Sequence, residues 1–300
     1  MNKKCPFFTI SLLLLTFLFG CAVVFAEGNS VDGYLKAAKA LIIEEKYVEG
    51  FDKLKEVIEL DPRNLEAMHI IVEQVNNLQI DTDRTYALLE ELKVLARKYQ
   101  DPVYYYYLGN LYENLKFILD AKDAYDEAKV LNKENKALFA NGKSLGSFLI
   151  ESLNGIDKYI DGLERDIGKI DFASQEGRKK AAKLCASVAD SKGVDEAAVY
   201  YTSAIYLAPD DPEVAKAYVW LGSIMGYSGS IDLPKYYYNK AILINPDLPG
   251  VYEVLADFFQ MIKDQFPEKW GQEKNTELYN KTVAMLKKQG KTDLLSKIEK

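Results

Sequence analysis

Apolar and small residues recur at one fixed spacing in four stretches of the chain. In each stretch three such positions are separated by four and then three residues, and a proline or a lysine follows five residues later. Positions three and four apart share one face of an α-helix, and proline cannot continue a helix. The pattern therefore predicts four helices, each with a packed face and a defined end. The positions are Gly50, Leu54, Val57 and Pro62; Ala121, Tyr125, Ala128 and Lys133; Ala197, Tyr201, Ala204 and Pro209; and Pro234, Tyr238, Ala241 and Pro246.

A preceding helix is predicted upstream of these helices. It is marked by Tyr105, Leu108, Gly109 and Tyr112 in one stretch and by Tyr218, Leu221 and Gly222 in another, while Leu184–Cys185 and Leu255–Ala256 stand in the equivalent place elsewhere. Small residues let a neighbouring helix approach closely, and the tyrosine or leucine fills the space between the two helices. The chain is thus predicted to consist of repeated helix pairs.

This order of residues resembles the tetratricopeptide repeat (TPR) family, whose helix-turn-helix unit is about 34 residues long. Segment 102–135 matches nearly throughout, departing at Lys133 where proline is usual; 178–211 and 215–248 match almost as well, and 31–64 matches in its second helix and its Asp61–Asn64 ending. The resemblance implies an all-α fold, a right-handed α-solenoid of TPR helix-turn-helix repeats with about six to seven units, some degenerate.

Two long gaps in the register predict further, degraded units. The stop positions 62, 133, 209 and 246 are separated by 71, 76 and 37 residues, so one extra unit fits at 65–99 and another at 136–177. The second gap is rich in glycine, which weakens helices, and we expect a bend there between N-terminal repeats (27–170) and C-terminal repeats (171–300). After residue 249 we expect a helix from Val251 to Lys263, an insertion at 266–270, a helix through Tyr279 and Leu286, and a terminal cap at 293–300.

The N-terminus predicts export. Lys3 and Lys4 precede an apolar run from Phe7 to Phe19, which is typical of a signal peptide over residues 1–26. Two cleavage patterns stay open: Val24-Phe25-Ala26 suits ordinary signal peptidase, whereas Leu18-Phe19-Gly20-Cys21 resembles a lipobox in which Cys21 would be lipidated. The expected location is therefore periplasmic or, as a lipoprotein, membrane-anchored, with contact to the membrane only through that anchor.

The net charge limits the class of partner, and the position of the remaining cysteine indicates a structural role. Removal of residues 1–26 takes away two of 38 basic and none of 45 acidic residues, so the mature net charge is 36 minus 45, or −9. A chain with this net negative charge repels the phosphate backbone, so we do not expect nucleic acid as a partner. Cys185 is the one cysteine beyond the signal segment, and it stands in the apolar helical run 181–186, where a small core residue is expected.

Candidate catalytic motifs are weak. Residues 137–144 match the loose form of a phosphate-binding loop, but no strand precedes them and they contain one glycine. His69, the one histidine, stands in an apolar run without evident partners for a metal or a triad. We therefore expect a protein that is not an enzyme and has no catalytic residues, metal or cofactor.

The 21 tyrosines are the unusual feature, with uninterrupted runs at 104–107 and 236–238. In the family that the chain resembles, certain positions of each first helix line a concave groove. Transferred to this chain, these positions are Tyr106, Asn110 and Glu113; Lys179, Ala182 and Ala186; Lys216, Val219, Ser223 and Tyr227; and Glu253, Asp257 and Gln260. The alternative that the tyrosines pack between helices stays open. The Lys and Asn pattern with which some TPR domains bind a terminal carboxylate is not evident.

These features favour a non-enzymatic protein–protein interaction scaffold in the bacterial cell envelope, which binds a peptide or partner protein in the concave groove. The alternative is a lipid-anchored accessory component of a transport or outer-membrane assembly system, which requires acylation of Cys21.

Overall fold

The computed structural model describes residues 30–77, 80–134 and 144–299, and within them the fold is entirely helical. Fifteen α-helices and one short 3-10 helix (Pro212–Val214) follow one another, and no strand occurs in these ranges. Consecutive helices pack as pairs, so the predicted all-α solenoid of repeats is confirmed. The predicted signal peptide, including Cys21, lies outside the described residues. Residues 137–143 of the segment that resembles a phosphate-binding loop also lie outside them.

The described chain divides into two compact units, the first of which contains residues 30–77 and 80. It is built from α2 (Val31–Ile43), α3 (Tyr47–Leu60) and α4 (Leu65–Asn76). Ser30 and Asn64 cap α2 and α4 by accepting hydrogen bonds from backbone N–H groups in the first turn. Phe51, Leu54 and Val57 on α3 are buried, which is the face that the repeat spacing predicted.

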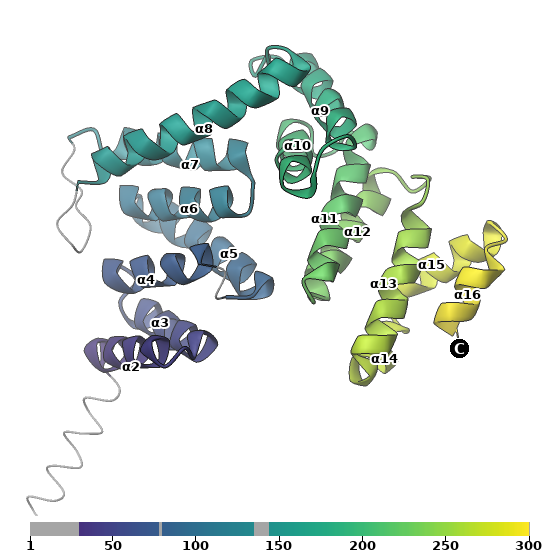
Figure 1. Cartoon of the computed structure of the whole chain (residues 1–300), viewed down its shortest axis with the longest axis horizontal. Helices are drawn as coiled ribbons and strands as arrows, with labels where there is room; N and C mark the ends of the chain where they lie inside the picture. The colour runs from purple at the N-terminus through teal and green to yellow at the C-terminus, as the bar shows by residue number, and fades with distance from the viewer. Residues whose placement is uncertain (1–29, 78–79, 135–143, 300) are drawn as a thin grey trace, which may run out of the picture. The chain divides into compact units, whose positions relative to one another are not determined.

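The second unit contains residues 81–134 and 144–299, and it carries the remaining helices. α6 packs against α7, α9 against α10, and α11 against α12, so three repeat pairs predicted from the sequence are present (Figure 1). The predicted boundary between residues 170 and 171 stays a prediction. The helices are α5 (Thr82–Tyr99), α6 (Pro102–Asn114), α7 (Ile118–Leu131), α8 (Leu145–Ile167), α9 (Gln175–Ala189), α10 (Val194–Leu207), α11 (Ala215–Tyr227), α12 (Asp232–Ile244), α13 (Val251–Gln265), α14 (Pro267–Glu273), α15 (Glu277–Lys288) and α16 (Thr292–Glu299).

Glycine and tyrosine form the same contact in two of these pairs. A Cβ atom added to Gly109 would lie 2.5 Å from a ring carbon of Tyr125, and one added to Gly222 would lie 2.7 Å from a ring carbon of Tyr238. Both tyrosines are buried. The small residue on the first helix therefore admits the large residue on the second, as the spacing predicted.

The segment at 136–177 differs from the prediction. A degraded helix pair was expected at 136–177, but residues 144–174 contain one long helix, α8 (Figure 1). Leu149, Leu153, Ile156 and Leu163 are buried along one face of α8. Packing of this apolar stripe outweighs the cost of the glycines inside the helix, which is about 1 kcal/mol each relative to alanine.

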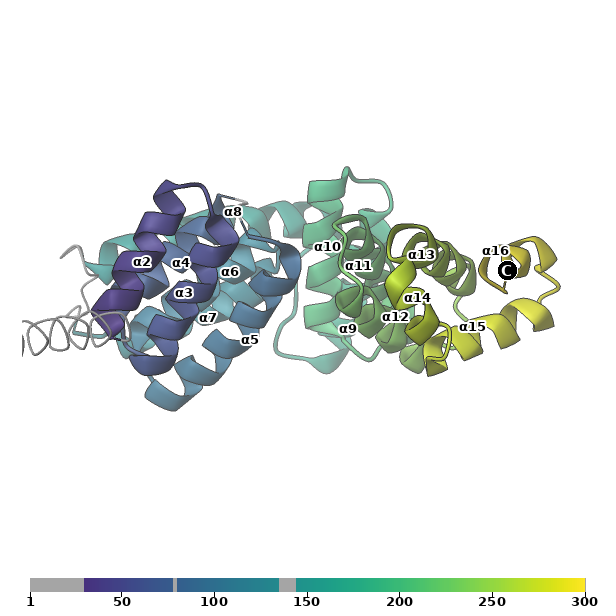
Figure 2. The same cartoon turned by 90° about the horizontal axis from the view of Figure 1, so that it is seen from below.

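The end of the chain adds three helices to α13. α14 occupies the predicted insertion, and α15 and α16 both pack against α13 (Figure 2). Phe259 stacks edge-on against Tyr279 at 5.2 Å between ring centroids. Leu295 and Ile298 of α16 are buried in the same core. The ending that looked polar in the sequence is thus an amphipathic helix, and its apolar side chains complete the core around α13.

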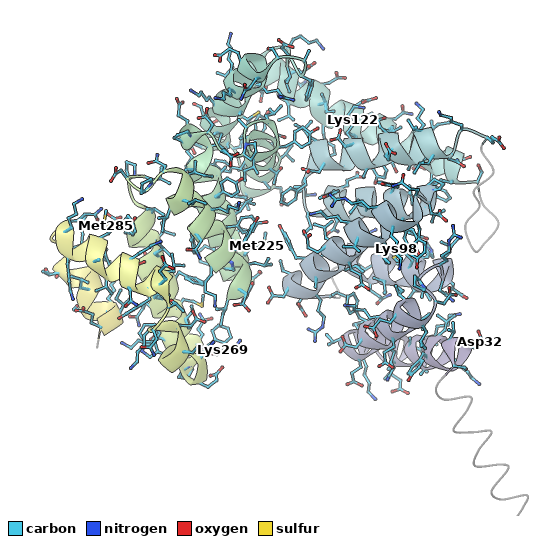
Figure 3. All side chains as sticks on the ribbon, turned by 180° about the vertical axis from the view of Figure 1, so that it is seen from behind. Asp32, Lys98, Lys122, Met225, Lys269 and Met285 are labelled. Carbon is cyan, nitrogen blue, oxygen red and sulfur yellow. The ribbon has the colours of Figure 1, made fainter. Side chains whose placement is uncertain are left out.

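In the second unit, the second helices of two repeat pairs contact each other. Tyr206 on α10 donates a hydrogen bond to Asp123 on α7 at 2.6 Å, and the Thr202 hydroxyl donates to the carbonyl of Lys116, before α7, at 2.6 Å. α7 and α10 are thus in contact, and Figure 3 draws the described side chains as sticks, with Lys122 of α7 labelled. Across the described ranges, we find no helix with the length and apolar content that a transmembrane segment requires.

Candidate partner-binding surface

The predicted groove residues on α6 are engaged in packing within the protein. The ring of Tyr106 lies 5.8 Å from that of Tyr125 and 6.1 Å from that of Phe148 on α8, measured between centroids. The Tyr125 hydroxyl donates to the Glu113 carboxylate at 2.9 Å, and the Asn110 amide donates to the Tyr106 carbonyl at 3.0 Å. α8 therefore lies against this face of α6, and burial raises the pKa of Tyr106.

The residues predicted on α9 and at the start of α11 also have structural contacts. Ala182 and Ala186 are buried, and Lys179 is partly buried. The Lys216 ammonium lies 2.6 Å from a carboxylate oxygen of Asp190, which also accepts a hydrogen bond from Tyr201. This three-residue contact holds α11 to the end of α9 and to α10.

Three predicted residues come together at a hollow between α11 and α13. Ser223, Tyr227 and Asp257 line a space of about 240 Å³, which we call the α11–α13 hollow. The Tyr227 side chain is 90% exposed, whereas most tyrosines of the second unit are at least partly buried. The other lining residues are Gly226, Tyr238, Val254, Phe258 and Met261.

The hollow is mainly apolar, with polar groups at defined places. Ser223 donates to the Val219 carbonyl at 3.0 Å, and its oxygen lies 3.3 Å from the Tyr238 hydroxyl. Burial raises the pKa of Tyr238 to about 12, so that this phenol stays neutral at physiological pH. Asp257 is the one charged residue among those that line the hollow.

The predicted residues on α13 also have polar contacts within the protein. Glu253 pairs with Lys291 at 3.3 Å, and Asp257 pairs with Lys297 at 3.6 Å. The Gln260 amide donates to the Asp264 carboxylate at 2.7 Å on the same helix. Val219 packs at the edge of the apolar core of α13.

Sequence reasoning missed the apolar floor of the hollow. Val254, Phe258 and Met261 were not among the predicted residues, although they lie one helical position from Glu253, Asp257 and Gln260. The transfer of groove positions selects one residue per turn, and so it omits the apolar neighbours that a ligand would contact. The apolar spacing of α13 was a usable signal.

A larger hollow of about 540 Å³ lies between α8, α10 and the α6–α7 turn. Its central charges pair with each other: Lys192 lies 2.6 Å from Asp166, and the Tyr200 hydroxyl donates to the same carboxylate at 2.5 Å. The carboxylate therefore has its positive partner within the protein. None of the predicted site residues lines this hollow.

The lone cysteine beyond the signal segment and the one histidine both lie in the described part of the chain. Cys185 is buried, and burial raises the pKa of its thiol to about 12, which suits a core residue. His69 is exposed on α4. Among the residues that the structure describes, no three His, Cys, Asp or Glu side chains are grouped as metal ligands.

Helix pairs in register and glycine–tyrosine contacts between the paired helices define an all-helical repeat protein, the class that the resemblance to TPR proteins implied. The comparison with curated proteins supports this class: the chain is similar to the TPR repeat-containing protein YpiA of Bacillus subtilis (strain 168), with 29% identity over 155 residues. The matched segment covers 50% of this chain and 35% of the relative, so the chain spans about a third of that protein's length. The resemblance to TPR proteins is thereby confirmed. No family model matches the chain.

Proposed function

We propose that the protein is a non-enzymatic interaction scaffold that binds a peptide or a partner protein at the α11–α13 hollow. The similarity to a TPR repeat-containing protein supports a role in protein–protein interaction. The single observation that carries the site is Tyr227, an aromatic side chain that is 90% exposed at the edge of an apolar hollow. Exposed aromatic residues beside a hollow are typical anchors of protein interfaces.

The hollow suits recognition better than catalysis. Its polar groups are a serine, two phenols and one carboxylate, and none of its lining residues is a histidine, lysine or cysteine that could serve as a general base or nucleophile. A partner side chain can bury apolar surface against Phe258 and Met261 while Ser223 and Asp257 fix its orientation.

Export to the cell envelope is part of this proposal. It is supported by Lys3, Lys4 and the apolar run that follows them, and the lipidated form by Cys21 after Leu18-Phe19-Gly20. Incorporation of labelled fatty acid into the full chain, lost in Cys21→Ala, would identify the lipoprotein form. Export without incorporation of the fatty-acid label, together with cleavage after Ala26, would identify the soluble periplasmic form.

Affinity capture with site variants tests the binding site. Residues 27–300 are immobilised and exposed to an envelope extract of the native cell, and captured proteins are quantified for the wild type, Tyr227→Ala and the control Tyr236→Ala. Tyr236 is a second exposed tyrosine that does not line the hollow. We expect a partner captured by the wild type and the control but reduced at least about fivefold with Tyr227→Ala. Equal capture by all three would exclude the α11–α13 hollow as the binding site.

A further inference from the structure

We propose that the α11–α13 hollow receives a lysine or arginine side chain of the bound segment. This rests on the proposed function and specifies the chemistry of the partner. The floor of the hollow is apolar, formed by Val254, Phe258 and Met261, and Asp257 is the one charged lining residue. A long side chain with an aliphatic stem and a cationic end matches this combination, because the stem buries apolar surface while the cation meets a carboxylate.

The size of the hollow fits one side chain. Its volume is about 240 Å³, below the range of roughly 300–1,000 Å³ that is usual for sites that enclose a whole small ligand. A partner that inserts one residue and lies across the surface with its backbone therefore fits better than a free small molecule.

The chain itself already places lysines on this face of α13. Lys297 of α16 lies 3.6 Å from Asp257, and Lys291 lies 3.3 Å from Glu253. The contact with Asp257 is loose, since the Lys297 and Asp257 side chains are 49% and 69% exposed. Such exposed pairs contribute little to stability and are easily exchanged. Lys297 thus shows which charge the carboxylate attracts, and it competes with an incoming cation.

Tyr227 provides a second group for a cation. Its ring is 90% exposed and lines the same hollow as Asp257. An aromatic face attracts ammonium and guanidinium groups, and this attraction adds to that of a neighbouring carboxylate. An acidic segment would instead be repelled by Asp257, with no lining cation to compensate.

Peptide selection tests the inference. A random 12-residue peptide library displayed on phage is selected against residues 27–300 of the wild type, of Asp257→Asn and of the control Asp247→Asn. Asp247 is an exposed aspartate in the turn before α13, and it does not line the hollow. We expect enrichment of lysine or arginine at one position for the wild type and the control, and loss of that enrichment for Asp257→Asn.

Titration of the most enriched peptide, labelled with fluorescein, measures how much each variant changes the affinity for the peptide. Asp257→Asn should weaken binding about fivefold, as loss of one partly exposed charge pair implies, and added NaCl should reduce the difference between the two proteins. Lys297→Gln should strengthen binding, because it removes the competing ammonium. Unchanged or weaker binding by Lys297→Gln would contradict the competition.

The outcomes separate the two proposals. If selected peptides bind and Tyr227→Ala weakens them, but acidic or purely apolar residues are enriched, the binding site stands and the preference for a cation is wrong. If selected peptides bind equally well to Tyr227→Ala, the binding site itself is wrong. If no peptide is enriched above an unrelated helical protein, both proposals fail.

Discussion

The hydroxyl groups of Tyr86 and Tyr237 lie 3.1 Å apart in a buried contact between α5 and α12, although 151 positions separate the two residues. Their rings meet edge-on at 6.4 Å between centroids. Nearby, Ser230 donates a hydrogen bond to Asp83 at 2.5 Å. These contacts, with those between α7 and α10, hold α5–α7 against α10–α12 within the second unit.

The tyrosine pair predicts non-additive stability effects. Tyr237 donates to Tyr86, so Tyr86→Phe leaves a buried donor without an acceptor, which costs about 1–3 kcal/mol. Tyr86→Phe combined with Tyr237→Phe should be less destabilising than the sum of the single changes by about 1 kcal/mol. Urea unfolding of the four proteins measures this coupling, with the exposed Tyr236→Phe as control. Strict additivity would show that the hydroxyl groups do not interact.

Asp120 predicts a pH dependence of stability. Burial, assisted by the nearby Asp123 carboxylate, raises the pKa of Asp120 to about 6 from an ordinary 3.8. The folded protein therefore binds this proton more tightly than the unfolded chain does, and the free energy of unfolding should fall as pH rises from about 4 to above 6.

Asp120→Asn removes the cost of burying the charge. It should stabilise the protein at pH 8 by about 1–3 kcal/mol, the upper value being the full pKa difference, and change stability little at pH 4. Unfolding by urea at both pH values measures this. Asp126→Asn, which alters an exposed carboxylate of α7 paired with Lys122, is the control. Equal effects of Asp120→Asn at both pH values would contradict the shifted pKa.

Two helical glycines predict opposite responses to alanine. Gly109 faces the Tyr125 ring so closely that an added Cβ would lie 2.5 Å from it, whereas a Cβ on Gly155 would meet nothing within 4 Å. Gly109→Ala should therefore destabilise by about 1–3 kcal/mol through overpacking. Gly155→Ala should stabilise by about 0.5–1 kcal/mol, because alanine favours the helix. Melting temperatures measure both, and a decrease of similar size for both variants would contradict the contact with Tyr125.

The repeat pairs were predictable because their information is local. The distance between Gly109 and Tyr125, or between Gly222 and Tyr238, is set within one helix pair, so spacing in the sequence reports a contact in space. The single helix α8 was not predicted, since its glycines suggested a weak helix and its apolar stripe acts only through packing. The pairing of Tyr86 with Tyr237 has no local signal at all.

The candidate surface was predictable only in part for a related reason. Family positions identify a face of each first helix, but they do not show which face the rest of the chain covers. α8 packs against the face that carries Tyr106, whereas Tyr227 stays exposed beside the hollow. The depth of the hollow comes from Phe258 and Met261, and it depends on how α13 packs against α11.

This difference between covered and open positions predicts that two acidic residues of the transferred set act in different ways. Glu113 accepts a hydrogen bond from the buried Tyr125 at 2.9 Å, so Glu113→Ala leaves that hydroxyl without its acceptor and should destabilise by about 1–3 kcal/mol. Asp257 is 69% exposed and pairs loosely with Lys297, so Asp257→Ala should change stability by less than about 0.5 kcal/mol. Urea unfolding and peptide titration of both variants separate a structural from a binding role. A destabilised Asp257→Ala with intact binding would show that Asp257 serves packing and not binding. A stable Glu113→Ala with lost binding would place the functional surface on α6.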